Sequence, residues 1–182
     1  MKTDSYGNHL QSSWKSFGQA RILLFAHESI KVKLINFGIQ YNDLPMLSCE
    51  VSLGLEKKTI VNFFYREFMG GVSGLSDIQS QHERLSRMVN VWKLIYDRNR
   101  DTICLGDANV CGVKWTHEDY HYKDLGDLIQ SFLLETDSCQ LVREYTRSEM
   151  VRGHTLSRSL IDYWYSNVAD KITSSAVLSI GS

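Results

Sequence analysis

The chain has little proline, no paired cysteines, no long apolar run and almost no net charge. Pro45 is the one proline among 182 residues, which argues against a long rigid linker. The four cysteines are scattered without a C-x-x-C pair, so we predict reduced thiols, with neither a zinc site nor a disulfide framework. No apolar stretch has the length of a membrane span, and the first residues lack the apolar segment of a signal peptide. We therefore expect an intracellular protein, nuclear or cytoplasmic, that is neither secreted nor inserted in a membrane.

The balance of charge excludes a global attraction to polyanions. The chain has 20 basic and 21 acidic residues, for a net charge of −1. Binding to nucleic acid would therefore need a local patch. Arg143, Arg147, Arg152 and Arg158 provide a candidate, because they lie close together in the sequence and are interleaved with hydroxyl groups. They form either a phosphate-contacting surface or a solvated loop.

Apolar patterning divides the chain into a loose polar leader, residues 1–18, and one domain, residues 19–182. Alternating or continuous apolar residues predict strands at 20–27, 29–37, 46–55, 58–65, 101–107, 139–145, 159–167 and 171–180. Apolar residues at helical spacing predict amphipathic helices over 75–97 and 124–135. This order of elements predicts an α/β sandwich, in which a mixed sheet is layered with helices.

The segment DTICLGDAN, residues 101–109, combines a buried strand with polar groups at its end. Asp107 and Asn109 are two residues apart, so on an extended segment both project to the same side. A carboxylate beside an amide suits hydrolysis, because the acid orients or deprotonates a water molecule and the amide binds a substrate oxygen. Gly-Asp-x-Asn is also typical of turns, in which these side chains bond the local backbone.

Tyr65 and Arg66 follow another apolar strand and are expected at the same sheet edge. A guanidinium there matches the oxygens of a phosphate, although an edge tyrosine also commonly anchors core packing. Asp162 lies within the apolar run SLIDYW, where a carboxylate needs a partner such as a histidine, an arginine or a metal. It is either a functional residue or one partner of a structural salt bridge to Arg158 or another base. Thr146 and Thr155 are weaker candidates, because their hydroxyls also suit turns.

In this order, the motifs FFYRE, LGDAN, YTR and SLIDYW resemble the endonuclease/exonuclease/phosphatase superfamily, which has the DNase-I-like fold. The similarity covers roughly residues 18–182 and is closest to the endonuclease domains of non-LTR retrotransposons. It implies a four-layer α/β sandwich with mixed, mostly antiparallel sheets, here incomplete. It also implies a DNA-nicking phosphodiesterase that uses Mg²⁺, in a longer polyprotein with a reverse transcriptase.

The resemblance implies a role for each matching residue. Asp107 would activate the water, Asn109 would bind the scissile phosphate, Tyr65 would assist there, and Asp162 would orient a catalytic histidine. The hydroxyl of Thr146 would help to position the substrate. Arg66, Arg147 and Thr155 are the remaining candidates for substrate contact.

The chain also departs from the family pattern. Ala108 replaces the usual phenylalanine of Gly-Asp-Phe-Asn, and Glu67 replaces the proline that commonly follows Tyr-Arg. We find no counterpart of the strand with the metal-binding glutamate or of the closing Ser-Asp-His, so no residue is assigned as a metal ligand. We therefore expect a partial domain with little or no nuclease activity alone. The alternatives are a non-catalytic binding module of the same fold and a superfamily phosphatase.

Overall fold

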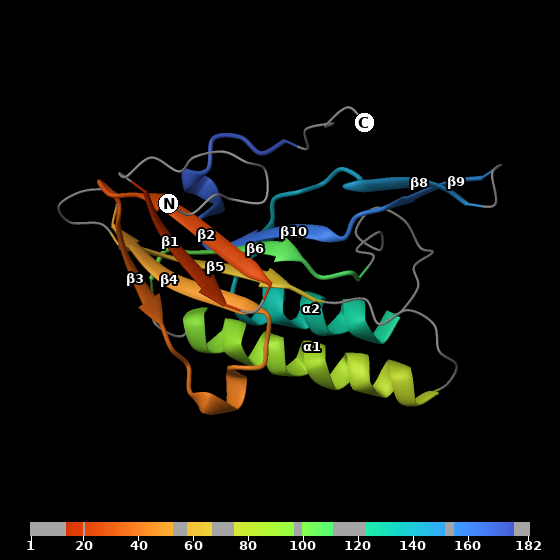
Figure 1. Cartoon of the computed structure of the whole chain (residues 1–182). Helices are drawn as coiled ribbons and strands as arrows, with labels where there is room; N and C mark the ends of the chain where they lie inside the picture. The colour runs from red at the N-terminus through yellow and green to blue at the C-terminus, as the bar shows by residue number, and fades with distance from the viewer. Residues whose placement is uncertain are drawn as a thin grey trace.

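The computed structural model describes residues 14–19, 21–52, 58–66, 75–96, 100–110, 123–151 and 155–176. The strands are β1 (Trp14–Gln19), β2 (Ile22–His27), β3 (Lys31–Ile35), β4 (Met46–Ser52), β5 (Lys58–Tyr65), β6 (Thr102–Asp107), β7 (Cys139–Gln140), β8 (Arg147–Val151), β9 (Thr155–Ser159) and β10 (Asp162–Ser166). The helices are η1 (Ile39–Tyr41), α1 (Leu75–Tyr96), α2 (Lys123–Glu135) and η3 (Ala169–Lys171). Figure 1 shows α1 and α2 side by side beneath the main sheet.

The main sheet has six strands in the order β3-β4-β5-β6-β10-β7. The β5–β6 ladder is parallel, and the other ladders of this sheet are antiparallel. A parallel pair needs a long crossover, and α1 lies between β5 and β6 in the sequence. The sequence-based prediction of an α/β fold with a mixed, mostly antiparallel sheet is confirmed.

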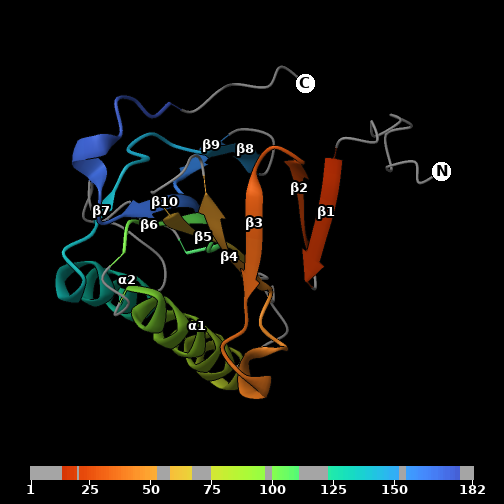
Figure 2. The same cartoon turned by 90° about the vertical axis from the view of Figure 1, so that its left-hand side faces the viewer.

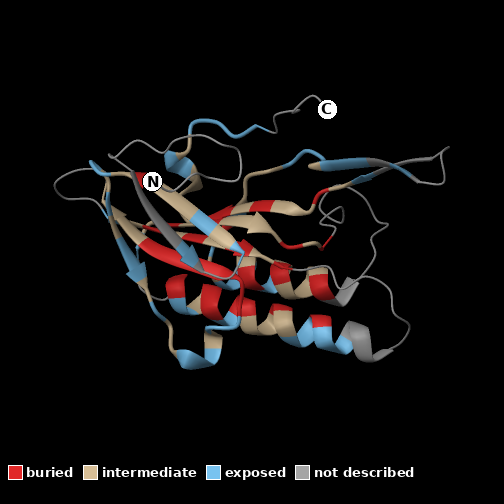
Figure 3. Cartoon of the chain, in the orientation of Figure 1, coloured by how far each residue is buried: buried red, intermediate tan, exposed pale blue. Residues whose placement is uncertain are grey.

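The core lies where α1 and α2 cover one face of the sheet. Trp92 of α1 is fully buried, and its ring centroid lies 4.8 Å from that of Phe64, 5.4 Å from that of Phe132 and 5.6 Å from that of Tyr165. Figure 3 shows buried residues concentrated between the helices and the sheet. The helix-facing side of the sheet is therefore filled by core packing, and we look for a polar functional site on its other side.

The opposite face of the sheet is partly covered by the β1–β2 hairpin, which Figure 2 shows on the far side from the helices. Met46 and Ser48 of β4 pair with Phe64 and Asn62, which face the helices. Leu47 and Cys49 alternate with them and therefore point to the opposite face, where Leu47 and Cys49 are both buried. β1 begins inside the stretch predicted as a loose leader, so that prediction is wrong from residue 14 onward, and residues 1–13 lie outside the described part. A polar strand forms here because its backbone pairs with the apolar β2.

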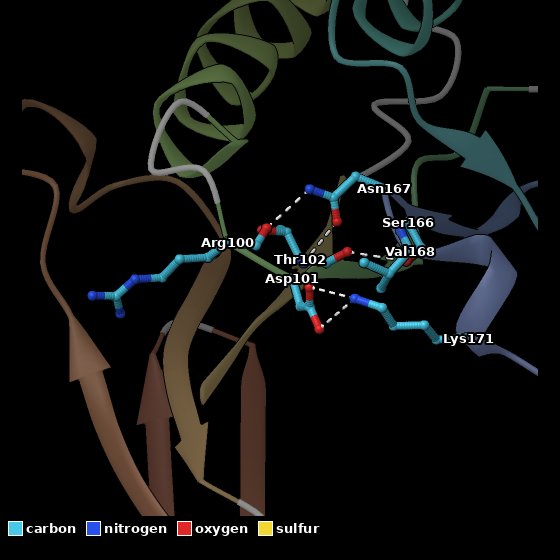
Figure 4. Close-up of polar contacts among 7 residues, drawn as sticks. All are labelled: Arg100, Asp101, Thr102, Ser166, Asn167, Val168 and Lys171. Carbon is cyan, nitrogen blue, oxygen red and sulfur yellow. Dashed lines mark hydrogen bonds and ion pairs between the residues drawn. The ribbon is translucent and has the colours of Figure 1, made fainter. Parts of the chain in front are cut away.

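The start of β6 is anchored to the end of β10 by polar contacts, drawn in Figure 4. Asn167 accepts a hydrogen bond from the Thr102 N–H at 2.9 Å and donates to the Arg100 carbonyl at 2.9 Å. The Lys171 ammonium lies 2.9 and 3.0 Å from the two carboxylate oxygens of Asp101. This network holds β6 at the end opposite Asp107 and so fixes the strand that carries the candidate acid.

The predicted strand over residues 171–180 is not found in its described part. Lys171 ends η3, and residues 172–176 join no described strand, while residues 177–180 lie outside the described part. An apolar run extends a sheet only where a partner edge is free to pair with it.

Within the described residues, no helix is long and apolar enough to cross a membrane.

Candidate functional site

Tyr65, Asp107 and Asp162 form a row across three neighbouring strands. In the strand register Tyr65 pairs with Asp107 across the parallel β5–β6 ladder, and Asp107 pairs with Asp162 across the antiparallel β6–β10 ladder. Residues paired in register point to the same face of a sheet. Their neighbours Phe64 and Tyr163 are buried against the helices, so the row faces the other side. All three side chains of the row are half-buried.

The Asp107 carboxyl is under opposing influences. Burial raises its pKa, and the negative charge of Asp162 opposite raises it further. The hydrogen bond from the Asn109 N–H, at 2.7 Å, and the charges of Arg66 and Arg147 act in the lowering direction. The net effect is a raised pKa, and perturbed acids of this kind are common at functional sites.

Asn109 lies in a left-handed turn directly after β6. Its φ is 48°, a conformation that asparagine tolerates better than most residues. Its side-chain amide donates to the Arg66 carbonyl at 2.7 Å, and its N–H donates to the Asp107 carboxylate. The turn interpretation of Gly-Asp-x-Asn is therefore found in the structure, because both side chains bond nearby backbone groups, and the catalytic interpretation stays a prediction.

Arg66 lies at the predicted sheet edge, but its side chain does not face a substrate. Its side chain is 0% exposed, and its guanidinium donates to the carbonyls of Ala108 and Asn109 and to Oε1 of Gln81. A fully buried guanidinium with three protein acceptors is not available to a phosphate in this structure. We therefore correct its predicted substrate contact to a structural one, because the side chain turns inward under the loop after β6.

The Thr146 hydroxyl also bonds the protein itself. Its Oγ1 accepts hydrogen bonds from the backbone N–H groups of Ile161 and Asp162, at 3.1 and 3.2 Å. Its own N–H donates to the Ser159 carbonyl at 3.0 Å. This geometry supports the start of β10, and hence Asp162, and the contact of Thr146 with substrate stays a prediction.

The β8–β9 hairpin leads out from this region and was not expected from the sequence (Figure 1). Arg147 begins β8, is exposed, and is close enough to Asp107 for its charge to act on that carboxyl. Thr155 pairs with Val151 at the far end of the hairpin from Arg147, and its side chain lies outside the described part. Of the predicted substrate contacts, the structure thus brings Arg147 to the row and does not bring Thr155 there.

Two residues near the site were missed by sequence reasoning. The Arg21 guanidinium, in the turn between β1 and β2, lies over the Tyr65 ring at 6.0 Å from its centroid. Gln81 of α1 is 4% exposed and holds Arg66. The sequence could have indicated a buried polar contact at Gln81, since this residue lies on the apolar stripe of the helix. Nothing in the sequence indicated a role for Arg21.

The site faces away from the helices and presents acidic, phenolic and cationic groups together. The two carboxylates of the row lie beside the Tyr65 phenol. Arg147 brings positive charge to the acidic end of the row, and Arg21 brings it to the phenolic end. Such a group of side chains is suited to a phosphate, whose oxygens bind cations while a carboxylate handles a proton or a water molecule. Among the described residues, no group of three or more His, Cys, Asp or Glu side chains forms a metal site.

Comparison with solved structures agrees with this architecture. The endonuclease domain of TRAS1, a telomere-specific non-LTR retrotransposon, superposes with a TM-score of 0.57 and 17% identity, covering 87% of this chain and 69% of that one. The chain has the DNase-I-like fold.

Two further structures with the DNase-I-like fold match less well. Beta toxin from Staphylococcus aureus gives a TM-score of 0.45 and 11% identity over 72% of this chain and 46% of that one. Truncated TDP2 from Caenorhabditis elegans gives 0.48 and 11% identity over 85% and 62%. No family model and no curated protein matches the sequence.

Proposed function

We propose that this chain binds DNA through the site of a Mg²⁺-dependent phosphodiesterase, and that alone it binds DNA with little or no cleavage. The observation that carries the proposal is the row of Tyr65, Asp107 and Asp162, assembled on three strands of a DNase-I-like sheet. The similarity to the endonuclease domain of TRAS1, a telomere-specific non-LTR retrotransposon, supports the choice of DNA as substrate.

Each residue of the row has a role that its surroundings support. Asp107 would take the proton of an attacking water, since its pKa is raised by burial and by Asp162, and a raised pKa makes the carboxylate a better base. The Asn109 side-chain amide donates one N–H to the Arg66 carbonyl and would bind a phosphate oxygen with its second N–H. The Tyr65 hydroxyl would donate to the same phosphate.

Magnesium fits this site only in part. Mg²⁺ is commonly held by one or two carboxylates together with water and substrate phosphates. Asp107 and Asp162 lie opposite each other, and the charge of Asp162 raises the pKa of Asp107, a repulsion that a divalent cation would relieve. Asp162 would hold Mg²⁺ that arrives with DNA, and the ion would stabilise negative charge on the phosphate, while Asp107 stays the base. With one described ligand, we expect weak Mg²⁺ binding in the absence of DNA.

Arg147 is the cation best placed for the DNA backbone. It is exposed, it begins the β8–β9 hairpin, and it lies within electrostatic reach of Asp107. Contacts to phosphates supply affinity and position a protein on the duplex without reading its sequence. We therefore expect Arg147 to bind a phosphate next to the one held by the row.

The proposal is tested with two measurements on the purified chain. The first is fluorescence anisotropy of a labelled duplex oligonucleotide across a range of salt concentrations. Arg147→Gln should weaken binding and reduce the slope of log K against log [salt] by about 1. Arg100→Gln makes the same change of charge at the opposite end of β6 and should leave the slope unchanged. No salt-sensitive binding by the unaltered chain would refute the proposal.

The second measurement is nicking of supercoiled plasmid with Mg²⁺ present or absent. We expect little or no nicking, because the described residues supply two carboxylates and no larger metal-binding group. Rapid Mg²⁺-dependent nicking that Asp107→Asn abolishes would show that the chain is a complete nuclease and would contradict the expected inactivity. The same result would leave the assignment of the row as the reactive site intact.

A further inference from the structure

The turn that carries Asp107 and Asn109 is held by contacts from elsewhere in the chain as well as by the local bond from the Asn109 N–H to the Asp107 carboxylate. Asn109 has a positive φ of 48°, a conformation that costs most residues other than glycine about 1–2 kcal/mol and asparagine less. The neighbouring Ala108 and Val110 are both fully buried. The turn therefore needs contacts from elsewhere in the chain to keep its shape.

Arg66 supplies those contacts from the end of β5. Its N–H donates to the Asp107 carbonyl at 2.8 Å, its Nε donates to the Ala108 carbonyl, and its Nη2 donates to the Asn109 carbonyl at 2.8 Å. Asn109 returns a bond from its side-chain amide to the Arg66 carbonyl at 2.7 Å. Three consecutive residues of the turn are thus bound to one arginine, Asp107 through the backbone N–H and Ala108 and Asn109 through the guanidinium, whose N–H donors lie in one rigid plane.

Gln81 fixes the arginine in turn. Its Oε1 accepts a hydrogen bond from Arg66 Nη1 at 2.9 Å, and both side chains are buried. A buried cation is stable only when its donors are satisfied, so an acceptor at this position of α1 has a clear physical purpose. The bond connects the helix layer to the turn at the end of β6.

We propose that Arg66 and Gln81 form a positioning clamp, in which α1 holds the Asp107–Asn109 turn in the geometry that the DNA site requires. Arg66 acts through the turn and does not touch the substrate. The role of the turn in DNA binding rests on the proposed function, whereas the existence of the clamp rests on the hydrogen bonds of Arg66 and Gln81.

The experiment compares three variants of the full chain. Gln81→Leu removes the acceptor, Gln81→Glu keeps one, and Gln79→Leu makes the same change of side chain at an exposed position of α1. Gln81 is chosen because replacing the arginine itself risks unfolding. Amide hydrogen exchange is followed by NMR at the N–H groups of Asn109 and Arg66, with Cys104 in the middle of the sheet as the internal reference.

We expect Gln81→Leu to speed exchange at Asn109 and Arg66 by about tenfold or more, the factor typical of losing one hydrogen bond to a charged group. Exchange at Cys104 should stay unchanged, Gln81→Glu should restore the slow exchange, and Gln79→Leu should have no effect. Equal acceleration at all three amides would indicate a general loss of stability and would overturn the clamp. Unchanged exchange in Gln81→Leu would overturn it as well.

DNA binding provides the functional readout. Gln81→Leu should weaken binding to the duplex several-fold while leaving the salt slope unchanged, because no phosphate contact is removed. Faster exchange in the turn with unaltered DNA affinity would overturn the positioning role. If the unaltered chain fails to bind DNA, the proposed function fails, and the exchange data still decide whether the clamp holds the turn.

Discussion

Replacing Gly106 by alanine tests the strand that delivers Asp107. A Cβ built on Gly106 would lie 1.9 Å from the backbone oxygen of Phe64, the residue that pairs with it across the parallel ladder. Real Cβ contacts are essentially never shorter than 3.0 Å, so β5 and β6 would have to separate locally by roughly 1.1 Å. The obstacle is backbone, which cannot move aside as a flexible side chain can.

The expected cost follows from the packing on either side of this pair. Phe64 and its ladder partner Met46 are buried, and the Phe64 ring packs against Trp92 of α1, so a shift of the ladder also disturbs the aromatic core. Overpacking of this kind typically costs 1–3 kcal/mol and here should reach about 3 kcal/mol. For a chain of this size that corresponds to a fall in the melting temperature of about 6–12 °C.

The assay is thermal unfolding followed by circular dichroism, with Gly18→Ala as the control. A Cβ at Gly18 would meet its nearest atoms, in Leu23 and Ile22, at the ordinary distances of 3.4 and 3.6 Å. The control should therefore melt close to the unaltered chain. A Gly106→Ala variant that melts within about 2 °C of the unaltered chain would refute the parallel register between β5 and β6.

Two further predictions concern charge and packing. Asp162→Asn removes the charge that raises the pKa of Asp107. A carboxyl whose pKa is raised in the folded state contributes stability at low pH, and this contribution is lost as the pH rises through that pKa. The variant lacks the repulsion behind part of this loss, so its stability relative to the unaltered chain should be greater at pH 7 than at pH 3. Urea unfolding at both pH values checks this, and an equal effect at each would contradict it. Phe132→Ala should cost about 3–5 kcal/mol by the same method, since Phe132 is fully buried against Trp92 and Tyr96, and a cost below about 1 kcal/mol would show a different core.

The local elements were largely predictable from the sequence. The helix predicted over 75–97 is α1, Leu75–Tyr96, and the helix predicted over 124–135 is α2, Lys123–Glu135. The strand ending at Asp107 was predicted with its polar end. These predictions succeed because apolar periodicity and turn residues act over a few neighbouring positions.

The hairpins were predicted poorly. β1 is too polar to be recognised as a strand, and β8 and β9 were interpreted as a loop rich in arginine and hydroxyl groups. These strands form through pairing with a partner, so their own composition carries little signal.

The sequence by itself determined the order of strands and helices and the chemical character of the residues at the strand ends. Only the tertiary structure decided which of these residues meet, because strand register depends on contacts between distant segments. Register placed Asp107 between Tyr65 and Asp162. Packing turned Arg66 inward to the turn and to Gln81, away from any phosphate, and made Thr146 a support for Asp162. The sequence determines the type of each side chain, whereas the direction in which the side chain points depends on the space that its neighbours leave in the folded protein.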